Sequence, residues 1–281
     1  MDRIDLHAHT TCSDGSMTPT ELFGHARDVG LRALAVTDHD TLSGWSESRR
    51  AAAAVGVEWI PGCEISTRLP TGTVHVLAYD VDAGNTDVQD LLTGIRTARD
   101  ARNDAILARL DRLGVGVTQD DVEQAASSPL VARPHIAMAL VARGHVEDLR
   151  EAFERYLRDG GPAYVPVEAP TPEKAIEIVA GARGMAVIAH PRQMKLGSHA
   201  RQRRVFTRWR DLGLVGIEVD HPSHDVTHRV MYRDISAALD LVPTGGSDFH
   251  GRYKPHIALG EGDGTIDVRY TTWERLQEKR R

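Results

Sequence analysis

Short apolar runs alternate with amphipathic stretches in the first third of the chain. Residues 4–6 alternate apolar and polar side chains and predict a strand, and residues 32–37 are typical of a buried strand. Between them, Thr18-Pro19-Thr20-Glu21 has the sequence of a capping box with proline at the first helical position, so we expect a helix from there to about Val29. A second helix at 42–55 and strands at 57–61 and 73–79 follow. This alternation at short spacing favours parallel βα units.

The pattern changes at about residue 82. The following residues carry long helical patterns and almost no strand signal, and they end in the helix-breaking sequence Gly160-Gly161-Pro162. The α/β pattern then resumes, and the last residues carry one short predicted helix that we expect to be peripheral. The predicted division is an α/β domain in two segments (1–81 and 169–262), a helical insertion (82–168) and a C-terminal extension (263–281).

Composition and charge narrow the class of protein. A chain of 281 residues with 41% hydrophobic residues can bury one large α/β domain or two modest ones. No apolar run reaches the ~18 residues of a membrane span, and the N-terminus begins a strand at once, so we expect a cytoplasmic protein without a membrane segment. A net charge of −6 argues against broad electrostatic capture of nucleic acid, although it does not exclude a phosphate substrate. Fourteen histidines against four phenylalanines indicate metal binding more readily than packing.

The first predicted strand delivers a candidate metal pair. Side chains two residues apart in an extended chain point the same way, so His7 and His9 can face one ligand together. Asp14, after the intervening turn, can return a carboxylate to the same place. Imidazole and carboxylate together suit divalent Zn, Mn or Fe. One such pair arises easily by coincidence, so the prediction depends on how often the arrangement recurs.

Metal-competent side chains recur at nearly every predicted strand. The carboxyl ends of parallel strands gather functional groups at one rim of an α/β domain. One zinc ion takes about three or four protein ligands, so a larger set implies two or three divalent ions. Glu64 is a natural bridge, because a carboxylate can bind one ion with each oxygen. The recurring residues are His7, His9, His39, Glu64, His75, His190, His221, Asp248 and His250.

Several motifs around these residues act together as a signature. They are Asp5-Leu6-His7-Ala8-His9-Thr10, Ser13-Asp14-Gly15, Thr37-Asp38-His39-Asp40, Gly62-Cys63-Glu64-Ile65-Ser66, His75, Ala189-His190-Pro191 and Gly246-Ser247-Asp248-Phe249-His250. As a set they resemble the PHP (polymerase and histidinol phosphatase) superfamily of metal-dependent phosphoesterases. The insertion, with Ala132-Arg133-Pro134-His135, is similar to the bacterial subgroup that hydrolyses nucleoside 3′,5′-bisphosphates and trims short RNA from its 5′ end.

The resemblance implies an α/β fold, a distorted (β/α)7 barrel with a helical insertion, that holds a trinuclear centre of Mn, Fe or Zn. On the family pattern, His7, His9, Glu64 and Asp248 would hold the first ion. Glu64, His75 and His190 would hold the second. Asp14, His39 and His250 would hold the third.

Such a centre needs no side-chain nucleophile, because a water that bridges two divalent ions supplies hydroxide near neutral pH. Asp38, Asp40 and His221 are candidates for relaying a proton or orienting a ligand. Capping of the helix ahead of Leu42 explains the two aspartates equally well.

Substrate recognition needs cationic groups outside the metal centre. Arg133 is the leading candidate because a guanidinium matches phosphate oxygens, and His135 lies beside it in the sequence. A surface or capping role for Arg133 also fits, because Pro134 marks a helix start. Lys195 follows His190 in a loop at 191–195, a segment that departs from the glycine-rich form of the subgroup. The basic run at 201–210 is more typical of a solvated helix face.

The leading hypothesis is a phosphoesterase that removes phosphate from a small nucleotide, for example from pAp to AMP, with 5′-to-3′ exonuclease activity on short RNA as a second activity. The partner would then be a small phosphorylated substrate. Histidinol phosphate hydrolysis is the first alternative. A metal-bound module that binds nucleotide or nucleic acid without catalysis is the second, although the complete ligand set argues against it. The sequence assigns neither the physiological metal nor the oligomeric state.

Overall fold

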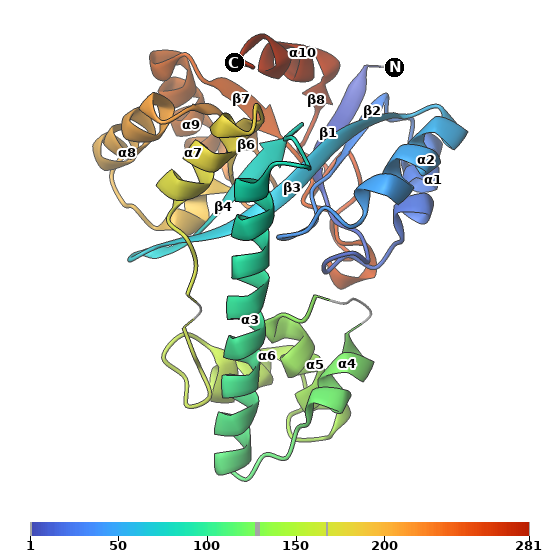
Figure 1. The fold of residues 1–281 in the computed structure, drawn as a ribbon, viewed down its shortest axis with the longest axis vertical. Helices are drawn as coiled ribbons and strands as arrows, with labels where there is room; N and C mark the ends of the chain where they lie inside the picture. Colours follow the sequence, from blue (N-terminus) through green and yellow to red (C-terminus); the bar gives the residue numbers. More distant parts are fainter. Residues whose placement is uncertain (1, 127–129, 167, 281) are drawn as a thin grey trace.

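The computed structural model describes residues 2–126, 130–166 and 168–280. Its strands form one sheet in the order β7-β6-β5-β4-β3-β2-β1-β8, which curls into a nearly closed barrel (Figure 1). The segment after β7 completes the closure at the far end of β1, where the Asp248 N–H donates to the His7 carbonyl and the His9 N–H donates to the Phe249 carbonyl, each at 2.9 Å. The strands are β1 (Arg3–Ala8), β2 (Ala33–Val36), β3 (Glu58–Leu69), β4 (Gly72–Tyr79), β5 (Met185–Ala189), β6 (Leu214–Asp220), β7 (Val242–Gly245) and β8 (Val268–Arg269).

The barrel is not wholly parallel, which corrects the expectation of uninterrupted βα units. β3 pairs with β4 and β4 with β5 in antiparallel register, whereas β1–β2, β2–β3, β5–β6 and β6–β7 are parallel. The reason is the short connection between Leu69 and Gly72, which pair directly, because a tight turn can join only antiparallel strands. Glu64 and His75 therefore lie within long strands and not after short ones.

Helices cover the outside of the barrel. The capping box predicted for the first helix is present, with the Thr18 hydroxyl accepting from the Glu21 N–H and the Glu21 carboxylate accepting from the Thr18 N–H. The helix predicted from residue 42 begins only after Gly44. These helices are α1 (Pro19–Asp28), α2 (Trp45–Val55), α7 (Pro172–Gly181), α8 (His199–Asp211) and α9 (Val226–Leu239), with short 3-10 turns η2 (Pro191–Met194) and η3 (Gly251–Tyr253) at the rim.

The C-terminal residues form part of the barrel core, so the expectation that they are peripheral is wrong. β8 pairs with the start of β1, and Trp273 and Leu276 of α10 (Tyr270–Glu278) are buried in the cluster that fills the barrel. The Trp273 ring lies 6.1 Å from the ring of Tyr79. A single-sequence pattern cannot show that an amphipathic helix closes the end of a barrel. In Figure 1, α10 lies beside the N-terminus, at the end of the barrel away from the helices between β4 and α7.

Residues between β4 and α7 are helical, as predicted, and extend away from the barrel along α3 (Figure 1). Their apolar side chains form a separate cluster that includes Ile106, Leu110, Ile136 and Leu140. The helices are α3 (Thr86–Arg112), α4 (Gln119–Ala125), α5 (Arg133–Ala142) and α6 (Leu149–Ala152), the last continuing into a π-helical turn η1 (Phe153–Leu157). We propose that residues 82–168 are an inserted unit, which this separate core supports. Over the described ranges, no helix is long and apolar enough to cross a membrane.

Candidate metal centre

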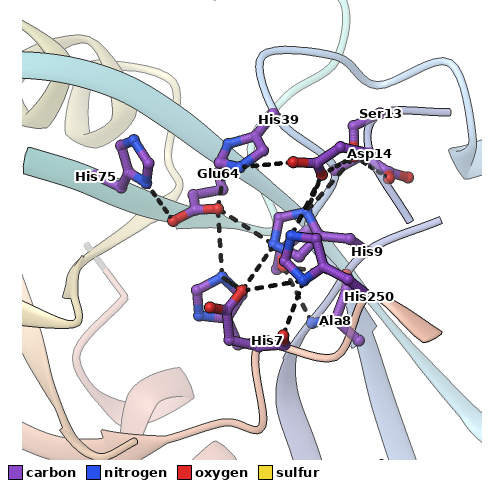
Figure 2. Close-up of polar contacts among 12 residues, drawn as sticks. His7, Ala8, His9, Ser13, Asp14, His39, Glu64, His75 and His250 are labelled. Atoms are coloured by element: carbon purple, nitrogen blue, oxygen red, sulfur yellow. Dashed lines mark hydrogen bonds and ion pairs between the residues drawn. The ribbon is translucent and has the colours of Figure 1, made fainter. Parts of the chain in front are cut away.

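Glu64 lies in the middle of the candidate metal centre, and its two carboxylate oxygens face different histidines (Figure 2). Its Oε1 lies 2.7 Å from His75 Nδ1 and 2.9 Å from His190 Nε2. Its Oε2 lies 3.3 Å from His7 Nε2 and 3.2 Å from His9 Nε2. The Glu64 carboxylate is therefore placed to bind two cations, one with each oxygen.

Asp248 adds a second carboxylate to the histidine pair of β1. Its Oδ1 lies 3.6 Å from His7 Nε2 and 3.4 Å from His9 Nε2. The backbone of Asp248 has a φ of 55°, and that of His190 a φ of 26°. A left-handed conformation in a non-glycine residue costs on the order of 1 kcal/mol, and such conformations concentrate at functional sites. The surrounding structure must therefore stabilise these two unfavourable backbone conformations at the rim.

Asp14, His39 and His250 form a third group beside His9 (Figure 2). Asp14 Oδ1 lies 3.4 Å from His250 Nε2, and Asp14 Oδ2 lies 3.7 Å from His39 Nε2. His39 Nδ1 also lies 3.2 Å from Glu64 Oε2. Burial lowers the pKa of His39 to about 4. The ring is therefore neutral near pH 7, which is the form that binds a metal.

The buried carboxylates and imidazoles of the centre shift one another's pKa values. Burial by itself would raise the pKa of Glu64, but the neighbouring His39, His75 and His7 hold that pKa well below its usual range. Burial lowers the pKa of His9, yet the adjacent carboxylates raise it overall to about 9. Each shift reflects anionic oxygens that are buried beside basic nitrogens and excluded from water.

Unpartnered nitrogens provide the test of whether metals fit. Buried polar atoms in proteins nearly always have a hydrogen-bond partner. In the part of the chain that the structure describes, six buried imidazole nitrogens have none. Five belong to residues of the centre, namely His7 Nε2, His9 Nε2, His39 Nδ1, His190 Nδ1 and His221 Nε2, and the sixth is His224 Nε2. Groups of three or four imidazole and carboxylate ligand atoms lie within 4.8 Å of one another around the first five. This donor set fits divalent cations such as Zn, Mn or Fe.

The nine residues predicted as ligands therefore converge at one rim of the barrel, although they come from segments up to 243 positions apart (His7 to His250). Those nine are His7, His9, Asp14, His39, Glu64, His75, His190, Asp248 and His250. Which residues bind which ion stays a prediction.

Glu218 of β6 is a site residue that the sequence analysis missed. It is fully buried, its Oε1 lies 2.9 Å from His7 Nδ1, and its Oε2 accepts the His190 N–H at 2.7 Å. A carboxylate on the second nitrogen of a ligating imidazole fixes the ring and its tautomer, so Nε2 of His7 points into the centre. The only sequence signal was a charged residue among the apolar residues that precede Asp220 in β6.

Asp38 holds the turn that carries Asp14. Its carboxylate accepts the Thr10 N–H at 2.8 Å, the Thr10 hydroxyl at 2.7 Å and the Ser13 hydroxyl at 2.6 Å. The alternative that Asp38 caps the following helix is wrong, because Gly44 occupies the N-cap position of α2. These contacts give Asp38 a positioning role, and its role as a proton relay stays a prediction.

Asp40 does not cap that helix either. It accepts from the Ser66 N–H at 2.7 Å and forms an ion pair with Arg99 of α3. The loop that carries His39 is in this way tied to both the barrel and the insertion.

His221 faces Asp248 and not the open cavity. The Ser223 N–H donates to His221 Nδ1 at 3.0 Å, so a neutral ring carries its proton on Nε2, which lies 3.4 Å from Asp248 Oδ2. The same Asp248 oxygen lies 2.6 Å from Lys254 Nζ. His221 is therefore placed to orient a ligand, one of its two predicted roles. Lys254, which the sequence analysis did not single out, brings a positive charge to the rim.

A cavity of about 800 Å³ opens over the centre. It is lined on one side by ligand-type residues and on the other by residues of the insertion, among them His135, Met138, Val141 and Leu149. His135 therefore reaches the site as predicted. Its Nδ1 accepts the Ala132 N–H at 3.0 Å, so the neutral ring has its proton on Nε2.

The other two predicted substrate contacts lie elsewhere. Arg133 lines a smaller neighbouring cavity and pairs with Asp159 at 2.8 Å. Lys195 is exposed and lines neither cavity, because the 3-10 turn η2 directs Gln193 to the rim instead. The prediction of Lys195 as a substrate contact is not supported by this position.

A barrel whose rim gathers histidines and carboxylates around a bridging glutamate defines a metal-dependent hydrolase. A family model for the PHP domain matches residues 5–168. The 3′,5′-nucleoside bisphosphate phosphatase of Chromobacterium violaceum is 34% identical over 280 residues, which cover 99% of this chain and 98% of that protein. The 5′-3′ exoribonuclease of Haemophilus influenzae is 34% identical over 274 residues, which cover 98% of this chain and 99% of the relative.

Among solved structures, a Bifidobacterium adolescentis protein assigned as a metal-dependent phosphoesterase matches with a TM-score of 0.87 and 33% identity, covering 99% of this chain and 96% of that one. The chain belongs to the PHP domain family and is a metal-dependent phosphoesterase. The family and the barrel fold predicted from the motifs are thereby confirmed.

Proposed function

We propose that this enzyme removes phosphate from small nucleotides, converting a nucleoside 3′,5′-bisphosphate such as pAp to the 5′-monophosphate, and that it trims short RNA from the 5′ end. The two bacterial relatives carry those activities in their names and align over nearly the whole chain. The observation that carries the proposal is the Glu64 carboxylate, whose two oxygens face separate sets of histidines. A site built to hold adjacent cations suits a phosphoryl group, which presents several anionic oxygens at once.

The proposed ligand sets follow the proximity of the side chains. His7, His9, Glu64 and Asp248 would hold one divalent ion, Glu64, His75 and His190 a second, and Asp14, His39 and His250 a third. Mn, Fe and Zn all suit these donors. Bound ions would supply hydroxide near neutral pH and neutralise phosphoryl oxygens.

Side chains outside the ligand sets orient the ligands and contribute to recognition of the substrate. Glu218 and His221 fix the first set by hydrogen bonding and charge, since they contact His7 and Asp248 from behind. Lys254 lies on the open side at 36% side-chain exposure, so its ammonium can meet an anionic substrate at the rim. The apolar wall of the large cavity, with Met138 and Leu149, offers a surface for a nucleoside. We expect the enzyme to act in the cytoplasm.

A substrate panel tests this proposal. Protein purified with Mn is offered pAp, nucleoside monophosphates, a 5′-phosphorylated short RNA and histidinol phosphate. We expect pAp and the RNA to be turned over, and Glu64→Gln to lose at least about 100-fold in kcat because the bridge loses its charge.

The matched control is Glu177→Gln, which changes an exposed glutamate on α7 and should behave as the unaltered protein. Inactivity of the Mn-loaded protein toward every nucleotide would refute the proposal. Faster turnover of histidinol phosphate than of all nucleotides would show instead that the enzyme is a histidinol phosphate phosphatase.

A further inference from the structure

One stretch of the chain carries basic residues and no acidic ones. Residues 178–210 contain eight Lys or Arg and no Asp or Glu, although acidic residues outnumber basic ones by 40 to 34 in the whole chain. Most of these cations lie on α8 or in the segment directly before it. The negative net charge is therefore not spread evenly, and this part of the surface is strongly basic.

Three of these arginines form a stripe along α8. Arg201, Arg204 and Arg208 follow one another at spacings of three and four residues, which places them on one face of a helix. All three are exposed. Another face of α8, with Phe206 and Trp209, is buried in the hydrophobic core. We call the three exposed residues the arginine stripe.

Most of the charge of the arginine stripe has no counter-charge. Arg201 and Arg204 form no ion pair within the described ranges. Arg208 lies 3.7 Å from Glu173 of α7, and its side chain is 72% exposed. Exposed ion pairs of this kind neutralise little charge and contribute little energy. The arginine stripe therefore presents a positive field to the solvent.

The arginine stripe begins near the rim that holds the metal centre. β5 ends directly before His190, and the turn after it places Gln193 against both cavities. Ser198 then caps α8, which lies on the outside of the barrel (Figure 1). Because β5 and β6 are parallel, α8 must run from this rim back to the other end of the barrel. Its 13 residues span about 20 Å, so the stripe leads away from the metal centre along the outer wall.

We propose that the arginine stripe binds the phosphate backbone of a single-stranded RNA whose 5′ end lies at the metal centre. This inference rests on the proposed function and adds to it a surface outside both cavities. Guanidinium groups match phosphate oxygens, and each contact releases condensed counterions from the RNA. The aromatic residues of α8, Phe206 and Trp209, are buried, so bases have nothing to stack on there. The surface therefore recognises the charge and length of the strand and not its base sequence.

An anionic membrane is the other partner that this charge would attract. A helix that binds a membrane surface inserts apolar side chains beside its basic ones. Within the described ranges, the exposed large apolar residues are Leu113, Leu149, Val226 and Val230, and none of them lies on α8. RNA also fits the start of the stripe at the rim, because a strand held by its 5′ end must leave the site over that rim.

The first test measures RNA binding. A fluorescently labelled, 5′-phosphorylated RNA of about 12 nucleotides, a length within the range of single-strand sites, is titrated with protein and followed by anisotropy. The titration uses Glu64→Gln with Mn, whose expected loss of turnover keeps the RNA intact. Adding Arg201→Gln and Arg204→Gln should weaken binding about 3- to 10-fold at low salt. The slope of log Kd against log salt concentration should fall by about 1.4, because each phosphate contact of a single strand contributes about 0.7.

The second test compares a long substrate with a short one in the Mn-loaded protein. Arg201→Gln combined with Arg204→Gln should lower kcat/KM for the RNA by the same factor as binding, through KM. For pAp, which is too short to reach α8, kcat/KM should stay within about twofold.

The matched control is Arg49→Gln combined with Arg50→Gln. It removes two exposed arginines from α2, which lies on the other side of the barrel from α8 (Figure 1). Neither arginine forms an ion pair within the described ranges. The control should leave RNA binding and both substrates unchanged, and both double variants should unfold at the temperature of the unaltered protein.

The outcomes separate this inference from the proposed function. If the double variant of the arginine stripe binds and cleaves RNA like the control, α8 is only a solvated helix face and the inference is wrong. Equal losses for RNA and pAp would also refute it, because they would show an effect on the active site. Binding to phosphatidylserine vesicles that the variant loses, with RNA binding unchanged, would identify a membrane surface instead. If the unaltered protein cleaves neither pAp nor RNA, the proposed function fails, and the anisotropy titration still decides whether the stripe binds RNA.

Discussion

Replacing Glu218 by glutamine removes one charge from behind the metal centre while keeping the size of the side chain. The carboxylate holds two donors at once, the His7 Nδ1–H at 2.9 Å and the His190 N–H at 2.7 Å. A glutamine has one acceptor oxygen and one amide that donates, so it must turn a donor toward one of these N–H groups. Because Glu218 is fully buried, no water can replace the lost acceptor.

The magnitude follows from the two contacts. Hydrogen bonds to a charged group contribute about 1.5–3 kcal/mol, and one of the two is lost in Glu218→Gln. Loss of such an outer contact to a metal-ligating histidine lowers metal affinity or activity about 10- to 100-fold, which corresponds to about 1.4–2.8 kcal/mol. The two estimates agree, so we expect the loss to appear mainly as weaker binding of the ion that His7 helps to hold.

The assay is a Mn titration followed by calorimetry, with bound metal counted by elemental analysis and with activity measured at saturating Mn. Glu177→Gln serves again as the control. We expect Glu218→Gln to need about 10- to 100-fold more Mn for half-maximal activity. If its Mn titration, metal content and activity all lie within twofold of the control, Glu218 does not orient His7 and the reasoning is wrong.

Two further predictions concern stability. Trp273→Ala should lower the free energy of unfolding by about 3–5 kcal/mol, because it empties the buried end of the barrel, and a urea titration that finds less than about 1 kcal/mol would show that α10 is peripheral after all. Asp40→Asn should cost about 3 kcal/mol, because Arg99 keeps its charge in a buried place without its partner. Hydrogen exchange should then accelerate in α3, and unchanged protection there would contradict the link between the insertion and the barrel.

The sequence was informative where chemistry is concentrated in motifs. Paired histidines, isolated acidic residues after apolar runs and the helix-starting sequence at Thr18 each carry a local signal, because metal ligands and helix caps require particular side chains at fixed spacings. All nine predicted ligands reach one rim for this reason. His135 also reaches the cavity above them, since it lies at the start of the helix that Pro134 marks.

The sequence was uninformative where a contact depends on partners far along the chain. Nothing local to Glu218 shows that its carboxylate meets His7, and nothing local to Lys195 shows that the turn before it directs Gln193 to the site. The cavity that Arg68, Arg99, Arg102 and Arg133 line is of the same kind. Arg68 and Arg102 stand in ordinary strand and helix patterns, and only the packing of α3 against the barrel brings them together.

The sequence by itself thus determined the alternation of strands and helices, the helical character of most residues between β4 and α7 and the identity of the metal-competent residues, since each depends on residue types and local periodicity. The barrel came from the resemblance of the motifs to a known family. Only the tertiary structure decided the antiparallel β3–β4 hairpin, the burial of α10 and the groups that contact the ligands from behind. Those features depend on which distant surfaces meet when the sheet closes, and closure is a property of the whole chain. The convergence of Arg68, Arg99, Arg102 and Arg133 on one cavity is likewise visible only in the folded chain.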